Sequence, residues 1–159
     1  MKHAGFTLVE LIIVLAIIAI IAVLAVPNII EARKFAHQGA AVASLRTIGA
    51  AQTLFHEADK EQDLNFDFGN LRELSDTLLV DGILGSGSKA GYLFQADYVT
   101  STSRFLWYGV ANPALAGITG DLYFATNHRG LVFFTFTGST SLNTVDGEMA
   151  TNLLPLNRQ

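Results

Sequence analysis

The sequence predicts an α+β fold in which one long amino-terminal helix packs against an antiparallel sheet. An unbroken run of Leu, Ile, Val and Ala occupies residues 11–26, and helical spacing continues to about residue 59. Four strand-like runs follow between residues 90 and 137. Helical spacing followed by alternating strands indicates a helix with a four-stranded antiparallel meander lying on its second half.

The apolar segment is long enough to cross a membrane. A helix over residues 6–26 is about 32 Å long at about 1.5 Å per residue, which matches the thickness of a bilayer core. Glu10 is the one charged residue in it. A carboxylate facing lipid costs on the order of several kcal/mol unless it pairs or faces a polar space. We therefore expect the segment to do more than anchor the chain.

The residues around Glu10 resemble the amino-terminal motif of the type IV pilin superfamily, which comprises pilins and the pseudopilins of type II secretion. A short basic leader ends at Gly5, and the next residue is Phe6. Glu10 is the fifth residue of a chain that begins at Phe6, and Pro27 stands near the far end of the apolar run. The resemblance covers about a fifth of the sequence.

This resemblance implies that a prepilin peptidase cleaves between Gly5 and Phe6 and methylates the amine of Phe6. It implies storage in the inner membrane with a cytoplasmic amino terminus. An assembly platform with its ATPase machinery then draws the subunit into a homo-oligomeric helical filament at the cell surface. We expect a type IV pilus that serves adhesion, motility or a related role. A type II secretion pseudopilin is the alternative, although the Tyr-Pro stretch and calcium loop usual in major pseudopilins are missing.

Glu10 is predicted to set the register of assembly. In a filament of staggered parallel helices, the Phe6 amine of one subunit can lie beside Glu10 of its neighbour. That pairing neutralises two charges that are costly in an apolar core, and only the correct stagger achieves it. The alternative is that Glu10 merely lies in the headgroup zone.

Pro27 is predicted to kink the helix. It has no N–H to donate to the carbonyl of Val23, and its ring strains the preceding turn. The resemblance adds a functional interpretation, in which Pro27 is a weak point that lets the helix stretch inside a filament.

Two other fates of the amino terminus remain open. Val23-Leu24-Ala25 has the small residues of a conventional signal-peptidase site, and cleavage after Ala25 gives a soluble secreted binding domain. Alternatively, the segment stays as a plain anchor with Lys2 inside, although Arg33 and Lys34 on the far side weaken the positive-inside asymmetry. Glu10 within the apolar run argues against both.

The chain is expected to divide into a leader, a membrane helix and one globular head. The formal charge of −4 becomes −5 when Lys2 leaves with the leader, which argues against a nucleic-acid-binding body. No cysteine is present, so packing alone holds the head together. The predicted boundaries are 1–5 for the leader, 6–27 for the transmembrane and filament-core helix, and 28–159 for the head, with an amphipathic helix to about 59, a loop and short helix over 60–89, the sheet over 90–137 and a tail over 138–159.

Within the head, one helical face is predicted to carry the core positions Val42, Leu45, Ile48, Gln52 and Phe55. Residues 57–69 are acidic and then alternate, which favours a half-buried extended stretch. Asp63-x-Asn65-x-Asp67 resembles the opening of a calcium loop, but the EF-hand pattern fails and we expect a solvated loop. A short helix over 70–79 with Asn70 as its cap should follow, and then a flexible connection over 82–88.

The strand-like runs cover residues 90–99, 104–111, 121–126 and 131–137, and Asn127-His128-Arg129-Gly130 is a hairpin-type turn. The aromatic residues in these runs are interpreted as sheet core: Tyr92, Phe94, Phe105, Trp107, Phe124, Phe133 and Phe134. No nucleophile elbow and no pair of histidines with metal-ligand spacing is present. We expect no enzyme, metal or cofactor, and the only chemistry is done to the chain, at the Gly5–Phe6 bond and the Phe6 amine.

Overall fold

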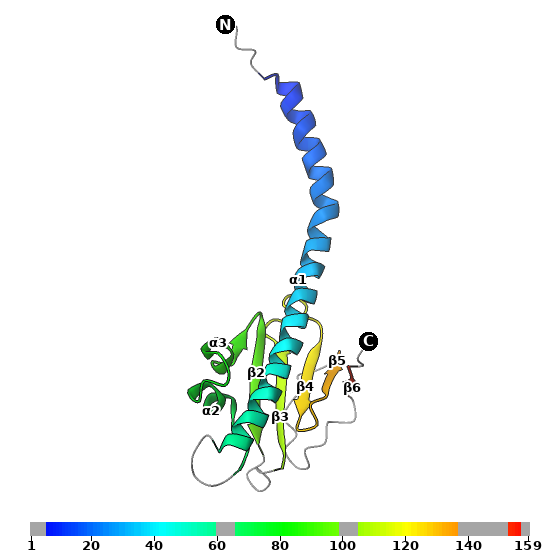
Figure 1. Cartoon of the computed structure of the whole chain (residues 1–159). Helices are drawn as coiled ribbons and strands as arrows, with labels where there is room; N and C mark the ends of the chain where they lie inside the picture. Colours follow the sequence, from blue (N-terminus) through cyan, green and yellow to red (C-terminus); the bar gives the residue numbers. More distant parts are fainter. Residues whose placement is uncertain (1–5, 60–65, 99–104, 137–152, 157–159) are drawn as a thin grey trace. The chain divides into compact units, whose positions relative to one another are not determined.

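A computed structural model describes residues 6–59, 66–98, 105–136 and 153–156 of the chain (Figure 1). The chain forms two compact units, Met1–Arg33 and Lys34–Gln159. The leader with Gly5, the residues Asp63 and Asn65 of the acidic segment, and most of the predicted tail lie outside the described residues.

Helix α1 (Leu8–Ala58) is 51 residues long and continues through Pro27 without a break. These bounds confirm the helix predicted from about Thr7 to about Asp59 to within one residue at each end. In the second unit the helix buries one face, as the heptad-like spacing predicts. The buried residues of this face are Gln38, Ala41, Ser44, Leu45, Ile48, Ala51, Gln52 and Phe55.

The second unit contains an antiparallel meander in which each strand pairs with the next along the chain. The described residues contain six strands instead of the predicted four. The strands are β1 (Ser88–Lys89), β2 (Tyr92–Tyr98), β3 (Trp107–Pro113), β4 (Tyr123–Asn127), β5 (Val132–Thr135) and β6 (Leu154–Pro155). The two additional strands, β1 and β6, lie at the two edges of the sheet and have two residues each. They are too short to show an alternating pattern in the sequence.

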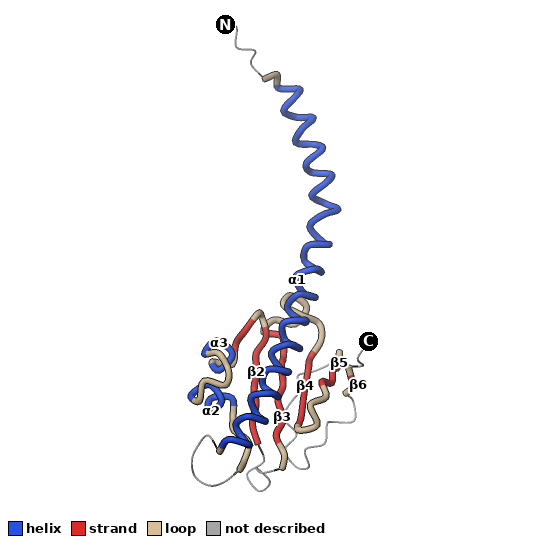
Figure 2. The backbone as a smooth tube through the Cα atoms, in the orientation of Figure 1, coloured by secondary structure: helices blue, strands red, loops and turns tan. Residues whose placement is uncertain are grey.

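The second half of α1 lies across the sheet, over β2, β3 and β4 (Figure 2). Small residues allow the close approach. A Cβ added at Gly49 of the helix would lie 3.6 Å from the Trp107 ring, and one added at Gly109 of β3 would lie 3.6 Å from Leu45 Cδ2. Tyr92, Phe94, Trp107 and Phe124 are buried between helix and sheet. Phe133 and Phe134 are partly buried, and Phe105 is 72 % exposed just before β3, so its assignment to the core was wrong.

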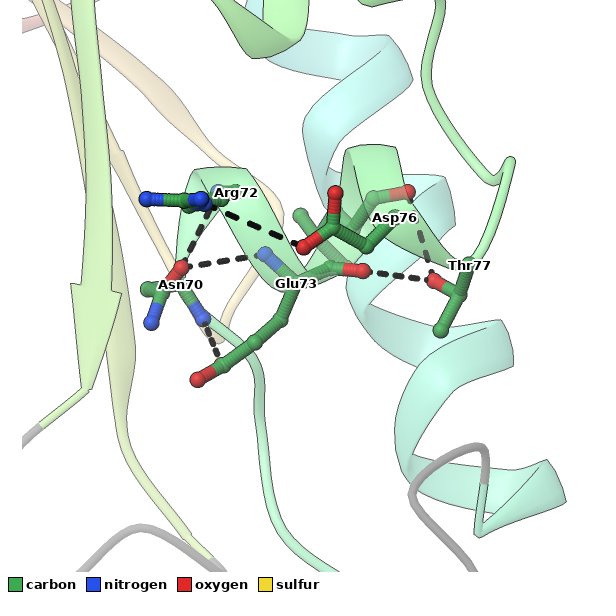
Figure 3. Close-up of polar contacts among 6 residues, drawn as sticks. Asn70, Arg72, Glu73, Asp76 and Thr77 are labelled. Carbon is green, nitrogen blue, oxygen red and sulfur yellow. Dashed lines mark hydrogen bonds and ion pairs between the residues drawn. The ribbon is translucent and has the colours of Figure 1, made fainter.

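Two short helices, α2 (Leu71–Asp76) and α3 (Gly82–Gly85), connect α1 to the sheet. Asn70 caps α2 as predicted: its side chain accepts from the N–H of Glu73, and the Glu73 carboxylate accepts from the N–H of Asn70 (Figure 3). The helix ends before the predicted residue 79. Leu78 has a φ of 59°, in the left-handed region, and the N–H of Leu79 donates a hydrogen bond to the Leu74 carbonyl, which closes the end of the helix.

Residues 82–85 of the expected flexible connection form the short helix α3, which the sequence did not predict. The Asp81 carboxylate caps α3 by accepting from the N–H of Leu84 at 2.9 Å, and Leu84 is fully buried. Lys89 Nζ lies 2.7 Å from the other oxygen of Asp81. The buried Leu84, the Asp81 cap and the ion pair with Lys89 therefore support the conformation of this glycine-rich stretch.

Candidate functional site

The first unit presents an apolar helix surface that the chain itself does not cover. Every residue from Leu8 to Ile30 is exposed except Ala25, which is partly buried. α1 is the one helix among the described residues that is long and apolar enough to cross a membrane, by length and composition. Such a surface is stable only against lipid or against other apolar helices.

The first turn of α1 is closed by a reciprocal pair of side chains, Thr7 and Glu10. The Thr7 hydroxyl oxygen accepts from the backbone N–H of Glu10 at 3.2 Å. The Glu10 carboxylate accepts from the backbone N–H of Thr7 at 3.0 Å and from its hydroxyl at 2.9 Å. This is a capping box, with Thr7 at the N-cap and Glu10 three residues later.

The cap lowers the free-energy cost of placing the Glu10 carboxylate in an apolar environment. Its carboxylate lies at the amino-terminal end of the helix, where the unpaired N–H groups and the helix dipole favour negative charge. Both donors from Thr7 bind the same oxygen, Oε2, so Oε1 takes no part in the cap. Glu10 is thus held in a fixed position while one carboxylate oxygen stays available to a further donor.

Phe6 precedes the helix and is 86 % exposed. Its backbone lies outside α1, which begins at Leu8. Phe6 is therefore accessible and outside the helix on its side of the predicted cleavage point. Gly5, on the other side, is outside the described residues.

Pro27 lies inside α1, and the side chain of the following residue makes a hydrogen bond one turn back. The Asn28 side-chain amide donates to the Leu24 carbonyl at 3.1 Å, one turn back. Pro27 itself donates nothing to Val23, so the ladder of backbone bonds is weakened at this turn. The predicted kink and stretching role of Pro27 stay predictions.

Sequence reasoning found Phe6, Glu10 and Pro27 but missed Thr7. The signal was present, because Thr7-Leu8-Val9-Glu10 has the Thr-x-x-Glu spacing of a capping box directly before an apolar run.

The head was also searched for side chains that could bind a metal ion. No group of three His, Asp or Glu residues that could hold a metal occurs in the part of the chain that the structure covers.

The amino-terminal segment also matches a known family. The model of the prokaryotic N-terminal methylation motif matches residues 1–26, a stretch that contains Gly5, Phe6 and Glu10. Comparison with curated proteins and with solved structures found no match. The chain therefore carries the prokaryotic N-terminal methylation motif, the class III signal peptide of type IV pilins and pseudopilins, followed by an apolar helix suited to a membrane-anchored precursor.

Proposed function

We propose that the chain is a structural subunit of a type IV pilus, processed at Gly5–Phe6, stored in the inner membrane and polymerised through α1. The observation that carries this proposal is the capped carboxylate of Glu10 at the start of an apolar helix segment whose Leu, Ile and Val side chains are exposed. An anchor needs the apolar surface alone, whereas assembly also needs a charge that recognises a neighbour.

Processing creates the partner of that charge. Cleavage before Phe6 leaves a new amine on Phe6, four residues before Glu10, and methylation retains its positive charge. The subunit's own Thr7 occupies Oε2 of Glu10, so Oε1 can accept from the Phe6 amine of a neighbouring subunit. The amine and carboxylate then neutralise each other inside the filament core, and only one axial stagger brings them together.

The apolar surface supplies the driving force for both states. Each exposed Leu, Ile or Val side chain gains roughly 1.5–3 kcal/mol when it is fully removed from water. The bilayer covers this surface before assembly, and the bundled helices of other subunits cover it afterwards. Extraction from lipid is therefore possible only into a structure that keeps the segment dry.

The test separates the charge of Glu10 from its capping role. Glu10→Gln keeps an oxygen that can accept from Thr7 and so preserves the capping box, but removes the charge. Glu10→Ala removes both. We expect each variant to be processed and inserted in the membrane, and each to give at least about tenfold fewer sheared surface filaments, the factor that corresponds to about 1.4 kcal/mol.

The controls are Thr7→Ser, which preserves the cap, and Thr7→Ala, which removes it while keeping the Glu10 charge. Both should assemble better than Glu10→Gln. Normal filament yield from Glu10→Gln contradicts the charge-pairing account. A mature chain that begins at Val26 in the soluble fraction, found by intact-mass measurement, contradicts the whole proposal. Loss of protein secretion without surface filaments upon deletion of the gene points to the pseudopilin alternative.

A further inference from the structure

A small pocket opens on the head beside the second half of α1. Its volume is about 240 Å³, and it lies where the helix passes β3 and β4, with Arg46 on the helix side and Trp107 on the sheet side. Pockets that bind small molecules are usually larger, about 300–1,000 Å³. This pocket, which we call the Arg46 pocket, is therefore better suited to a single side chain of a partner.

The donors in the Arg46 pocket favour a carboxylate as that side chain. The hydroxyls of Thr53 and Thr126 also line the pocket, but each donates its hydrogen within the chain, to the carbonyls of Gly49 and Leu131 at 3.2 and 2.9 Å. Arg46 is exposed and always carries its charge. A guanidinium group binds a carboxylate through two parallel hydrogen bonds, which makes this pairing stronger than one between neutral groups.

Arg46 differs from other basic residues of the head in having no acidic partner. The amino groups or guanidinium groups of three other residues lie 3.3, 3.9 and 2.7 Å from a carboxylate, and these residues are Lys34, Arg72 and Lys89. No carboxylate pairs with Arg46 in the parts of the chain that the structure describes. The pocket therefore holds a positive charge that its own chain does not neutralise.

Glu57 is the matching carboxylate on the same helix. It is exposed, and it forms no ion pair with any residue in the described ranges. It follows Arg46 by eleven residues, which is close to three full turns, so both side chains leave α1 on the same side. The rise between them is about 16.5 Å, too long for the two groups to meet within one chain. Opposite charges placed in this way can pair only between copies.

We propose that the Arg46 pocket of one subunit receives Glu57 of a neighbouring subunit. This inference rests on the filament proposed above and names a contact between its heads. The pocket and the carboxylate are different surfaces, so each subunit offers the pocket to one neighbour and Glu57 to another. A contact of this heterologous kind repeats into an open helical polymer. Subunits of a helical filament have neighbours at several axial offsets, so this contact and the pairing at Glu10 can involve different neighbours.

Exchange of the two charges tests the proposal in cells that assemble the full chain. Arg46→Glu and Glu57→Lys each place like charges at the contact, and each should lower the yield of sheared surface filaments by about threefold or more. The double variant restores opposite charges in exchanged positions, so its yield should return to within about twofold of the natural chain. The control is Arg72→Glu, at an exposed arginine outside the pocket, which should change the yield by less than about twofold.

Circular dichroism and the fluorescence of Trp107, the one tryptophan of the chain, check that each variant folds. Because Arg46 and Glu57 are exposed, we expect normal folding. Normal filament yield from both single variants overturns the proposal. A folded double variant that yields no more filaments than the single variants also overturns it, since the contact then does not depend on opposite charges.

Cysteine cross-linking tests which copies meet, because the natural chain has no cysteine. A disulfide joins Cα atoms less than about 7 Å apart, so Arg46→Cys combined with Glu57→Cys can link only different copies. We expect oxidised filaments of this variant to give a ladder of dimers, trimers and longer chains that a reductant removes. The control combines Arg72→Cys with Glu57→Cys and should give no ladder. Dimers alone indicate a closed two-fold contact and overturn the proposal, as does the absence of cross-links.

The natural chain distinguishes the failure of this inference from that of the proposed function. If the natural chain forms no surface filaments, the proposed function itself fails. If it forms filaments and the two single charge variants form them equally well, the head contact alone fails.

Discussion

Gln52 of α1 forms two hydrogen bonds with the backbone of Gly69. Its Oε1 accepts from the Gly69 N–H at 3.0 Å, and its Nε2 donates to the Gly69 carbonyl. Gln52 is fully buried, and a Cβ added at Gly69 would lie 3.0 Å from the Phe55 ring. One amide side chain therefore holds the segment that leads into α2 against α1, at a point where an added Cβ would press on the buried Phe55 ring.

We predict that Gln52→Leu destabilises the head by about 2–4 kcal/mol, because it leaves both polar groups of Gly69 buried without a partner. Urea unfolding of the detergent-solubilised chain, followed by the fluorescence of buried Trp107, measures this. The control is Gln95→Leu, a similar change at an exposed position of β2. A loss under about 0.5 kcal/mol for Gln52→Leu contradicts the assigned role.

Tyr92 makes the head sensitive to high pH. Its hydroxyl donates to the Leu122 carbonyl at 2.9 Å, and burial, with a smaller effect from the Asp121 charge, raises the pKa of Tyr92 to about 12. The unfolded chain releases this proton near pH 10, so it binds fewer protons than the folded chain above that pH. The Tyr92 contribution is therefore complete below about pH 10 and is lost as the pH rises towards about 12.

The variant Tyr92→Phe should show a smaller fall in the urea midpoint between pH 9 and pH 11 than the natural chain. Some fall remains, because burial also raises the pKa of Tyr108. At pH 8 the same variant should be about 1 kcal/mol less stable, since the Leu122 carbonyl loses its donor. An identical pH dependence in both proteins excludes Tyr92 as the source.

The sequence predicted the elements in which the pattern of apolar residues repeats over many positions. Leu45, Ile48 and Phe55 recur at helical spacing, so the buried face of α1 was readable over several turns. The edge strands β1 and β6 were not, because a two-residue strand has no alternation to detect. Phe105 was misplaced because it continued an aromatic run, and only the start of β3 at Trp107 shows that it lies outside the core.

In the candidate site, too, some residues were predictable from the sequence and others were not. Glu10 stood out because a charge in an apolar run is costly, whatever the fold. Its partnership with Thr7 depended on where the helix begins, and helix ends are weakly marked in sequence. The helix α3 was missed for a similar reason. Its glycines suggest mobility, while the cap from Asp81 and the burial of Leu84 act through contacts that composition does not reveal.

The capping box of α2 gives a matched pair of surface variants. We predict that Asn70→Ala costs about 1 kcal/mol, because the N–H groups of Arg72 and Glu73 lose their acceptor. Arg72→Ala should change stability by less than about 0.5 kcal/mol, since its ion pair with Asp76 spans 3.9 Å and both side chains are highly exposed. Thermal or urea unfolding of both variants ranks them. The reverse order contradicts the assignment of the cap as the stabilising element.

The contact between Lys34 and Asp121 predicts an asymmetry between its two partners. The Lys34 side chain is largely covered, whereas Asp121 is about half exposed. Asp121→Asn removes the carboxylate that lies 3.3 Å from a covered ammonium group and should cost about 1–2 kcal/mol. Lys34→Met replaces the covered charge with an apolar chain of similar length, leaves a carboxylate that water can solvate, and should cost less than about 1 kcal/mol. Unfolding free energies of the two single variants and the double variant test this. The double variant should have an unfolding free energy close to that of Lys34→Met, because without the ammonium group the exposed Asp121 carboxylate contributes little to stability. Equal costs for the two single variants contradict the argument, since burial of the lysine is the only source of the difference.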